Sequence, residues 1–138
     1  MRSALLIALA ALVTVPSVFA QETAIDTAAV VPDEQHLEYI AEAGRLAGEI
    51  QACELDWQQY YLAYMQSERR RAANEGRDPE GEEYQQRIAF IGMFFGANQG
   101  QALEQFKDQP CPDKHLPALA ERVGSVMEAA QEREGQGG

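Results

Sequence analysis

Apolar and polar positions along most of the chain repeat every three to four residues, which is the period of an amphipathic α-helix. Leu37, Ile40 and Ile50 follow this period, and later segments repeat it. No segment alternates with the period of two that indicates a half-buried strand. The pattern predicts an all-α fold, with helices at 32–53, 56–76, 78–106 and 113–133.

Local signals mark the ends of these helices. Asp33, Asp56, Asp78 and Asp113 each suit the cap of a helix N-terminus, and Gly76 suits the end of the second helix. The periodicity also allows the first two helices to run on as one. Helices joined by connections this short predict a small four-helix bundle.

The first twenty residues have the pattern of a secretory signal peptide. Arg2 precedes an uncharged, mostly apolar run from Ser3 to Val15, and Val18 and Ala20 fit the −3 and −1 positions of a signal-peptidase site. The alternative is an uncleaved membrane anchor, but a span needs about 20 apolar residues and this run is shorter. We predict cleavage after Ala20 and a periplasmic or secreted protein, with no membrane span in the mature chain.

The rest of the chain divides into a leader, a domain and a tail. Residues 21–31 are rich in Ala and Thr without a clear period, and residues 134–138 are mostly Gly and Gln. Short terminal segments of this kind are usually poorly ordered. We expect a flexible leader at 21–31, one helical domain at 32–133 and a disordered tail at 134–138.

The two cysteines, Cys53 and Cys111, have only each other as a partner within the chain. In an oxidising compartment this predicts a long-range disulfide, which would stabilise the fold by about 4 kcal/mol in the chain-entropy model. A redox-active pair is the alternative, but such pairs usually lie in a Cys-X-X-Cys turn. We therefore predict a structural bridge.

Glycines recur at every fourth position on two of the predicted helices, and each costs a helix about 1 kcal/mol relative to Ala. They are Gly44 and Gly48 on the first helix and Gly92, Gly96 and Gly100 on the third. Residues four apart share a helix face, so each helix offers a shallow groove. We expect the two grooves to pack on each other inside the monomer. A dimer or ligand interface is the alternative.

The third predicted helix is apolar nearly all round between residues 88 and 97. Phe90, Met93 and Phe94 lie around the helix from its glycine face. A helix of this kind is either central in the bundle or covered by a partner. We expect the central position, and a partner-binding surface if that expectation fails.

Amphipathic aromatic residues and a basic run on the second predicted helix form a candidate partner surface. Its residues are Trp57, Tyr60, Tyr61, Tyr64, Arg69, Arg70 and Arg71. The aromatic rings equally fit a core stripe whose hydroxyl groups reach the surface. The arginines equally fit a helix C-terminus, where cations are favourable, and the acids at Glu80, Glu82 and Glu83 are candidate counter-charges.

The balance of charges narrows the classes of partner. Eleven Lys and Arg residues face 22 Asp and Glu residues, so the net charge is −11. A phosphate backbone would be repelled, which argues against nucleic acid as a partner. The composition, 46% hydrophobic and 24% charged, is that of an ordinary globular domain.

Few side chains in the predicted mature chain are equipped for catalysis. Ser67 and Ser125 are its only serines, and His36 and His115 begin different helices. We predict no catalytic residue, no cofactor and no metal site. A carboxylate pair acting as acid and base is the remaining enzymatic possibility.

These features predict an exported, non-enzymatic helical protein that binds another protein, of the immunity, inhibitor or envelope accessory type. A homodimer is also possible. An acid- or stress-responsive chaperone-like protein is the alternative, and a small hydrolase using paired carboxylates is a third. With Cys53, Cys111 and its acidic composition, the layout resembles in outline small periplasmic acid-stress chaperones and helical immunity proteins. No motif carries that resemblance.

Overall fold

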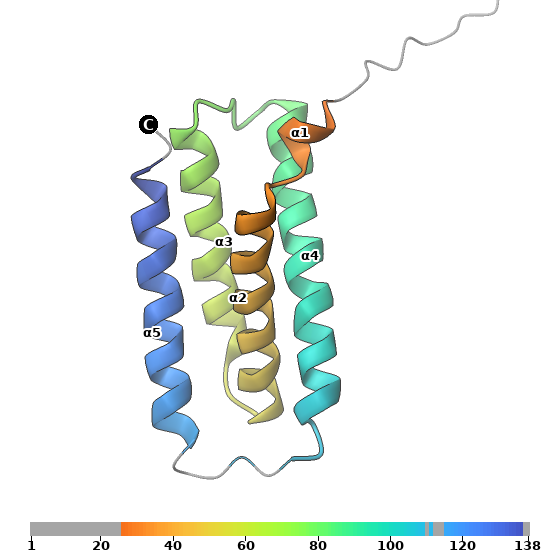
Figure 1. Cartoon of the computed structure of the whole chain (residues 1–138), viewed down its shortest axis with the longest axis vertical. Coiled ribbons are helices and arrows are strands. Elements are labelled where there is room, and N and C mark those ends of the chain that lie inside the picture. Colours follow the sequence, from red (N-terminus) through yellow and green to blue (C-terminus); the bar gives the residue numbers. More distant parts are fainter. Residues whose placement is uncertain (1–25, 110, 112–114, 137–138) are drawn as a thin grey trace, which may run out of the picture.

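The computed structural model describes residues 26–109, Cys111 and residues 115–136. These residues form one short and four long helices and contain no strand, so the predicted all-α bundle is confirmed (Figure 1). The helices are α1 (Thr27–Val30), α2 (Glu34–Ala52), α3 (Trp57–Asn74), α4 (Glu82–Phe106) and α5 (His115–Glu134). The predicted signal peptide and its cleavage point lie outside the described residues.

Side-chain caps begin α2 and α3 as the sequence predicts. Asp33 Oδ1 accepts a hydrogen bond from the His36 backbone N–H at 2.8 Å, and Asp56 Oδ1 accepts one from Gln58 at 3.0 Å. Between these helices Glu54 has a φ of 57°, in the left-handed region that ends a helix. The two helices are therefore separate. The predicted cap at Asp113 lies outside the described residues.

The predicted start of α4 at Asp78 is wrong by a few residues. Asp78 accepts hydrogen bonds through its side chain from the Glu80 N–H and through its carbonyl from the Gly81 N–H. These bonds close a turn instead of opening a helix, because Asp side chains readily bond to the backbone two residues on. The helix begins at Glu82, with Gly81 as its N-cap.

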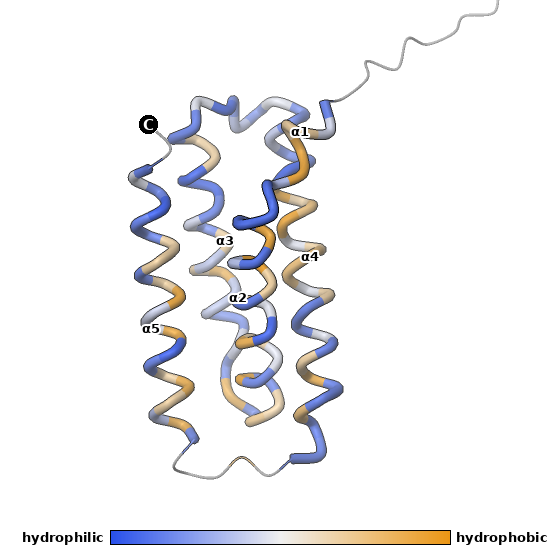
Figure 2. Tube along the Cα trace, viewed as in Figure 1, coloured by the Kyte–Doolittle hydropathy of each residue, from blue (hydrophilic) through white to orange (hydrophobic). Residues whose placement is uncertain are grey.

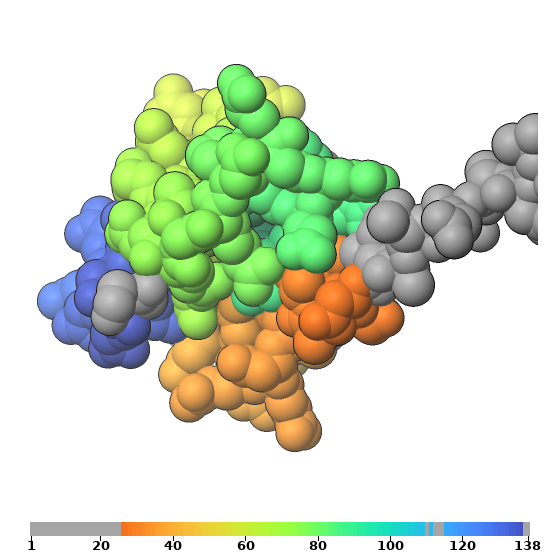
Figure 3. Space-filling model, turned by 90° about the horizontal axis from the view of Figure 1, so that it is seen from above, coloured from red at the N-terminus to blue at the C-terminus, as the bar shows by residue number. Residues whose placement is uncertain are grey.

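Seen from above, the ends of α5, α3 and α4 follow one another around the bundle, and α2 lies on the remaining side (Figure 3). α2 packs most extensively against α4, and α3 packs against α5. Hydrophobic and hydrophilic residues alternate along these helices (Figure 2). The aromatic centre of the core is Phe95, whose ring centroid lies 5.1 Å from that of Tyr61 and 5.5 Å from that of Tyr64.

Glycines bring α2 and α4 close together, but only the glycines of α2 take part. A Cβ atom at Gly44 would lie 2.4 Å from the Phe95 carbonyl oxygen, and one at Gly48 would lie 2.4 Å from that of Gln99. On α4, Gly92 faces the Tyr61 hydroxyl group instead of α2. The expected packing of two glycine grooves is therefore wrong, because α2 contacts a neighbouring face of α4.

The predicted disulfide between Cys53 and Cys111 is confirmed. The bridge spans 58 positions of sequence, and the Cα atoms are 5.4 Å apart. It ties the junction of α2 and α3 to the segment that leads into α5. Among the described residues, no helix has both the length and the hydrophobicity that a membrane span requires.

Both ends of the domain differ from the expected flexible segments. Within the leader, the structure describes residues 26–31, of which Thr27–Val30 form α1, and the Ala29 carbonyl oxygen accepts hydrogen bonds from Arg77 at 2.8 Å and Arg87 at 3.3 Å. At the other end, Glu134 belongs to α5 and bonds to α3. Within the described parts of these two segments, Ala29 and Glu134 therefore bond to distant residues, which polar composition alone does not reveal.

Candidate interaction surface

The tyrosines of the candidate surface on α3 lie largely inside the bundle. Tyr60 is 6% exposed and Tyr64 is fully buried, and the Tyr60 hydroxyl group donates a hydrogen bond to the Ala43 carbonyl oxygen at 3.1 Å. Trp57 and Tyr61 are half-buried and pack against the core. The partner surface proposed for these aromatic rings is therefore corrected to a core stripe.

The arginines of α3 have internal partners that the sequence did not predict. Arg70 donates two hydrogen bonds to the Glu134 carboxylate at 2.8 and 2.9 Å, and Arg71 pairs with Glu75 at 3.2 Å. Arg69 is exposed, without an ion pair to the described residues. The expected counter-charges, Glu80, Glu82 and Glu83, form no ion pair with these arginines.

The outer face of α4 is the apolar surface that the bundle leaves uncovered. The Met93 side chain is 66% exposed, and the half-exposed rings of Phe90 and Phe94 stack with their centroids 6.1 Å apart. Gly96 and Gly100 face open space, with no atom near the position of an added Cβ. The expected central position of α4 is therefore wrong for this face, because α4 occupies a corner of the bundle.

The exposed residues on this face have the spacing of a coiled-coil seam. Ala89, Met93, Gly96 and Gly100 are all exposed and follow one another at alternating steps of four and three residues. Alternation of this kind keeps one stripe of a helix facing a partner helix. Glycines in the stripe also allow a second backbone to approach closely. We refer to these four residues as the α4 seam.

Charge is absent along the α4 seam and is mainly negative at its ends. The chain carries no charged residue from 88 to 103, and Figure 2 shows mostly hydrophobic residues in the turns of α4 near its label, with hydrophilic residues further down the helix. Glu82 and Glu83 are exposed at one end, and Glu104 is exposed at the other. Lys107 pairs with Glu104 at 2.6 Å, which occupies the nearest cation. An acidic rim therefore borders an uncharged stripe.

A buried polar pair lies inside the bundle, where α2 contacts α3. His36 Nε2 is 2.8 Å from Glu68 Oε2, and the two side chains are 2% and 3% exposed. Burial by itself raises the pKa of Glu68, but the His36 hydrogen bond and the charge of Arg71 outweigh it and hold that pKa below its ordinary value. Burial also raises the pKa of the neighbouring Tyr64 hydroxyl group. Within the pair, each side chain compensates the other for the hydration that burial removes.

From the sequence, His36 was predicted only to begin a helix, and Glu68 was not singled out. One signal was available, since Tyr64, Glu68 and Ala72 are four residues apart and share a helix face. An acid between two apolar residues on one face indicates a buried carboxylate. Its partner could not be predicted, because His36 lies 32 positions away on another helix.

The histidines and serines, the remaining candidates for catalysis, either lie far apart or already form hydrogen bonds within the protein. His36 lies at the start of α2 and His115 at the start of α5, at opposite ends of the bundle (Figure 1). Ser67 donates a hydrogen bond to Glu134, and Ser125 donates one to a backbone carbonyl oxygen. Within the described ranges, no group of three His, Cys, Asp or Glu side chains is placed to hold a metal ion.

A pocket of about 260 Å³ lies beside the disulfide, and its lining contains residue types that are common in active sites. Its lining includes Cys53, Cys111, Glu49 and His115. The sulfur atoms are bonded to each other, and Glu49 accepts hydrogen bonds from Arg122 at 2.6 and 3.1 Å. His115 lies 3.9 Å from the same carboxylate. These lining residues therefore supply no activated nucleophile.

Fold and surface together define a small, disulfide-linked helical bundle in which the described residues leave the outer face of α4 without a partner. Comparison with protein-family models, with curated proteins and with solved structures gives no match for this chain. The functional argument therefore rests on its own residues.

Proposed function

We propose that this chain is an exported, non-enzymatic protein that binds another protein through the α4 seam. The observation that carries the proposal is an exposed, uncharged stripe with coiled-coil spacing on a helix that packs well on its other side. Exposed apolar patches rimmed by polar residues are typical of interaction sites. The disulfide supports export, since such bridges form in oxidising compartments.

The chemistry of this face indicates the kind of partner that fits it. Gly96 and Gly100 leave room for bulky side chains, and the rings of Phe90 and Phe94 offer an apolar wall. Glu82, Glu83 and Glu104 border the stripe in a chain of net charge −11. An amphipathic helix with an apolar seam and basic flanks complements both features.

A matched pair of variants tests this proposal. Met93→Glu places a charge in the α4 seam, whereas Leu62→Glu places one on α3 at similar exposure, 62% against 66%. Tagged wild-type protein should capture a partner from an envelope extract, Leu62→Glu should retain it, and Met93→Glu should lose it. Capture should also weaken as salt is raised, because the basic flanks of the partner are attracted electrostatically.

Three outcomes would contradict the proposal. Equal capture by the two variants would move the binding surface away from α4. Self-association of the wild type that Met93→Glu abolishes would make a second copy the occupant. Turnover of a cell-wall or sugar substrate by the purified protein would place it among enzymes.

A second candidate function is an acid-responsive, chaperone-like role, and three ion-paired carboxylates favour it. Glu68, Glu75 and Glu134 all have pKa values below the ordinary value and lie in ion pairs that tie helices or turns together. Protonation in acid would weaken these ties and expose apolar surface. Circular dichroism and binding of a hydrophobic dye between neutral and acid pH test the idea. An unchanged fold without dye binding in acid would remove it.

A further inference from the structure

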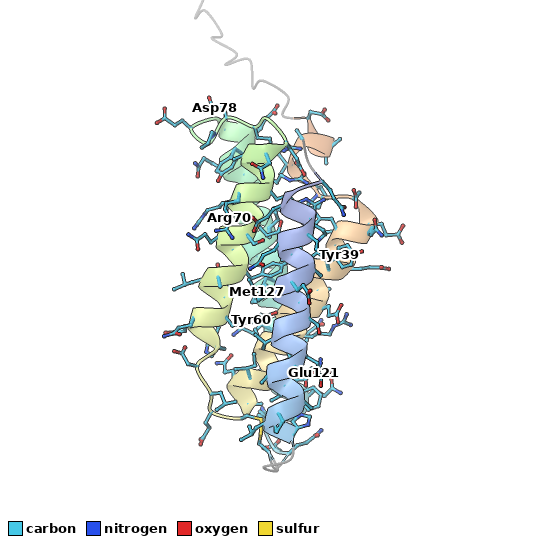
Figure 4. The ribbon with its side chains drawn as sticks, turned by 90° about the vertical axis from the view of Figure 1, so that its left-hand side faces the viewer. Tyr39, Tyr60, Arg70, Asp78, Glu121 and Met127 are labelled. Carbon is cyan, nitrogen blue, oxygen red and sulfur yellow. A yellow bond between two sulfur atoms is a disulfide. The ribbon has the colours of Figure 1, made fainter. Side chains whose placement is uncertain are left out.

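A second cavity lies at the end of the bundle opposite the disulfide. Its volume is about 260 Å³, and it is formed by the N-terminal turns of α2 and the C-terminal turns of α3 and α5. The titratable or charged residues in its lining are Asp33, His36, Tyr39, Arg71, Glu132 and Arg133. Figure 4 shows Tyr39 on one side of α5 and Arg70 of α3 on the other.

Two buried nitrogen atoms of residues that line this cavity have no partner among the described residues. They are His36 Nδ1 and Arg71 Nη1. Each of these side chains uses another nitrogen atom for a hydrogen bond: His36 Nε2 bonds to Glu68, and Arg71 Nε bonds to Glu75. Leaving a buried polar group unpaired is unfavourable, and most so for a charged group. Arg71 Nη1 is always a donor, and His36 Nδ1 is a donor when its ring is protonated, so the two atoms could then share one acceptor.

The acids around the cavity do not supply that acceptor. Glu68 and Glu75 bond to other atoms of the two side chains, and Asp33 caps α2 through the His36 backbone N–H. Glu132 is exposed. The remaining cation, Arg133, lies over the Tyr39 ring at 3.9 Å and forms no ion pair with the described residues.

We propose that this cavity binds a compact oxyanion, a carboxylate or phosphate group, whose oxygen atoms accept hydrogen bonds from Arg71 Nη1 and His36 Nδ1. Arg133 adds a second positive charge, and the N-terminus of α2 contributes the positive end of its dipole. Guanidinium groups are well suited to carboxylate and phosphate oxygens. The volume suits a small molecule or the end of a larger one, and this site is separate from the α4 seam.

Binding at this site depends on the proton of His36. Nε2 faces the Glu68 carboxylate and carries the proton of the neutral ring, so Nδ1 donates only when the imidazole is protonated. Other titratable or charged groups face the ring or the cavity from every element packed there: Tyr64 and Arg71 on α3, Asp33 and Tyr39 on α2, and Glu132 and Arg133 on α5.

Nitrogen NMR of the imidazole rings tests the site directly, because the chain has only two histidines. The full protein is titrated with inorganic phosphate and separately with succinate, at constant ionic strength set by sodium chloride. His36→Gln assigns the signals. We expect a saturable shift of the His36 ring with at least one anion, and no matching saturable shift of His115.

A matched pair of arginine variants completes the test. Arg71→Gln removes the donor in the cavity, and Arg69→Gln makes the same charge change at an exposed position two residues away. Affinity should fall about tenfold or more in Arg71→Gln and remain near wild type in Arg69→Gln. Met93→Glu should bind the anion normally, which separates this site from the proposed partner surface.

The proposal fails if neither phosphate nor succinate shifts the His36 ring saturably, a result on the wild type that no folding defect can obscure. It also fails if Arg69→Gln weakens binding as much as Arg71→Gln, which would indicate attraction to net charge alone. Preference for phosphate over succinate, or the reverse, identifies which class of oxyanion the site accepts.

Discussion

At the scale of single residues, the most constrained group is the Glu68 carboxylate. A charge this deeply buried is tolerated only when a partner compensates its lost hydration. His36 Nε2 at 2.8 Å supplies that compensation. The neighbouring Tyr64 hydroxyl group is also buried, without a hydrogen-bond partner among the described residues. The hydrogen bond between His36 and Glu68 thus links α2 to α3 inside an otherwise mostly apolar core.

Removing one member of this pair should destabilise the protein strongly. His36→Ala leaves Glu68 buried without its main partner, and we expect a loss of about 3–5 kcal/mol in the free energy of unfolding. Replacing both residues, as in His36→Leu with Glu68→Met, should cost much less, because no charge then remains to be compensated. Urea unfolding of both variants measures the difference. Equal losses would show that packing, and not charge, dominates at this position.

At the scale of elements, the contact between α2 and α4 depends on two glycines. Gly44 and Gly48 let the α4 backbone approach so closely that an added Cβ would overlap a carbonyl oxygen. On the opposite side of α4, Gly96 and Gly100 meet no atom. The same residue type therefore has two different roles, one in the core and one at the surface.

Alanine substitutions separate the two roles. Gly48→Ala would place its Cβ 2.4 Å from the Gln99 carbonyl oxygen, so the helices must move apart, and we expect a loss of about 1–3 kcal/mol. Gly96→Ala adds a methyl group in open space and should stabilise the fold by about 0.5–1 kcal/mol through helix propensity. Thermal melts followed by circular dichroism compare them. Destabilisation by Gly96→Ala would show that this face is covered.

At the scale of the whole molecule, the disulfide adds a covalent link between parts that packing and polar contacts otherwise hold together. It connects the junction of α2 and α3 to the segment before α5. Among the described residues, α5 otherwise meets the bundle mainly through α3. The bridge therefore limits how far the last helix can separate from the others in the unfolded chain.

Replacing both cysteines by serine should reduce stability by about 2–5 kcal/mol, the usual cost of losing a native bridge in a small exported domain. The helices should persist at low temperature, because their caps and apolar stripes do not require the bond. Circular dichroism melts with and without reductant measure the effect. Thiol titration of the denatured, unreduced protein is the control, and two free thiols there would contradict the bridge.

Stability should also fall in acid. The pKa values of Glu68, Glu75 and Glu134 are lowered from an ordinary value of 4.5, so these carboxylates stabilise the fold above that pH. The contribution is lost as pH falls through their lower folded values. The urea midpoint should therefore decline below about pH 4.5, and less steeply in the double variant His36→Leu with Glu68→Met. A midpoint independent of pH in this range would contradict the expectation.

The local rules of helix formation were enough to predict much of this architecture. Aspartate caps at Asp33 and Asp56, together with apolar periodicity, located α2 and α3, because these signals act within a few residues of one another. The cap at Asp78 misled, because an Asp-Pro sequence fits a turn as well as a helix start. The bonds that Ala29 and Glu134 make could not be predicted, since their partners are distant in the sequence.

The amino-acid sequence by itself determined the all-α class, the main helices and the pairing of Cys53 with Cys111. Each of these follows from periodicity, caps or elimination among two cysteines. Only the tertiary structure decided which faces meet. It placed Gly44 and Gly48 inside the bundle, left the α4 seam outside, and brought His36 to Glu68. Such choices depend on how four helices share one core, and a one-dimensional pattern records only that a face is apolar, not what covers it.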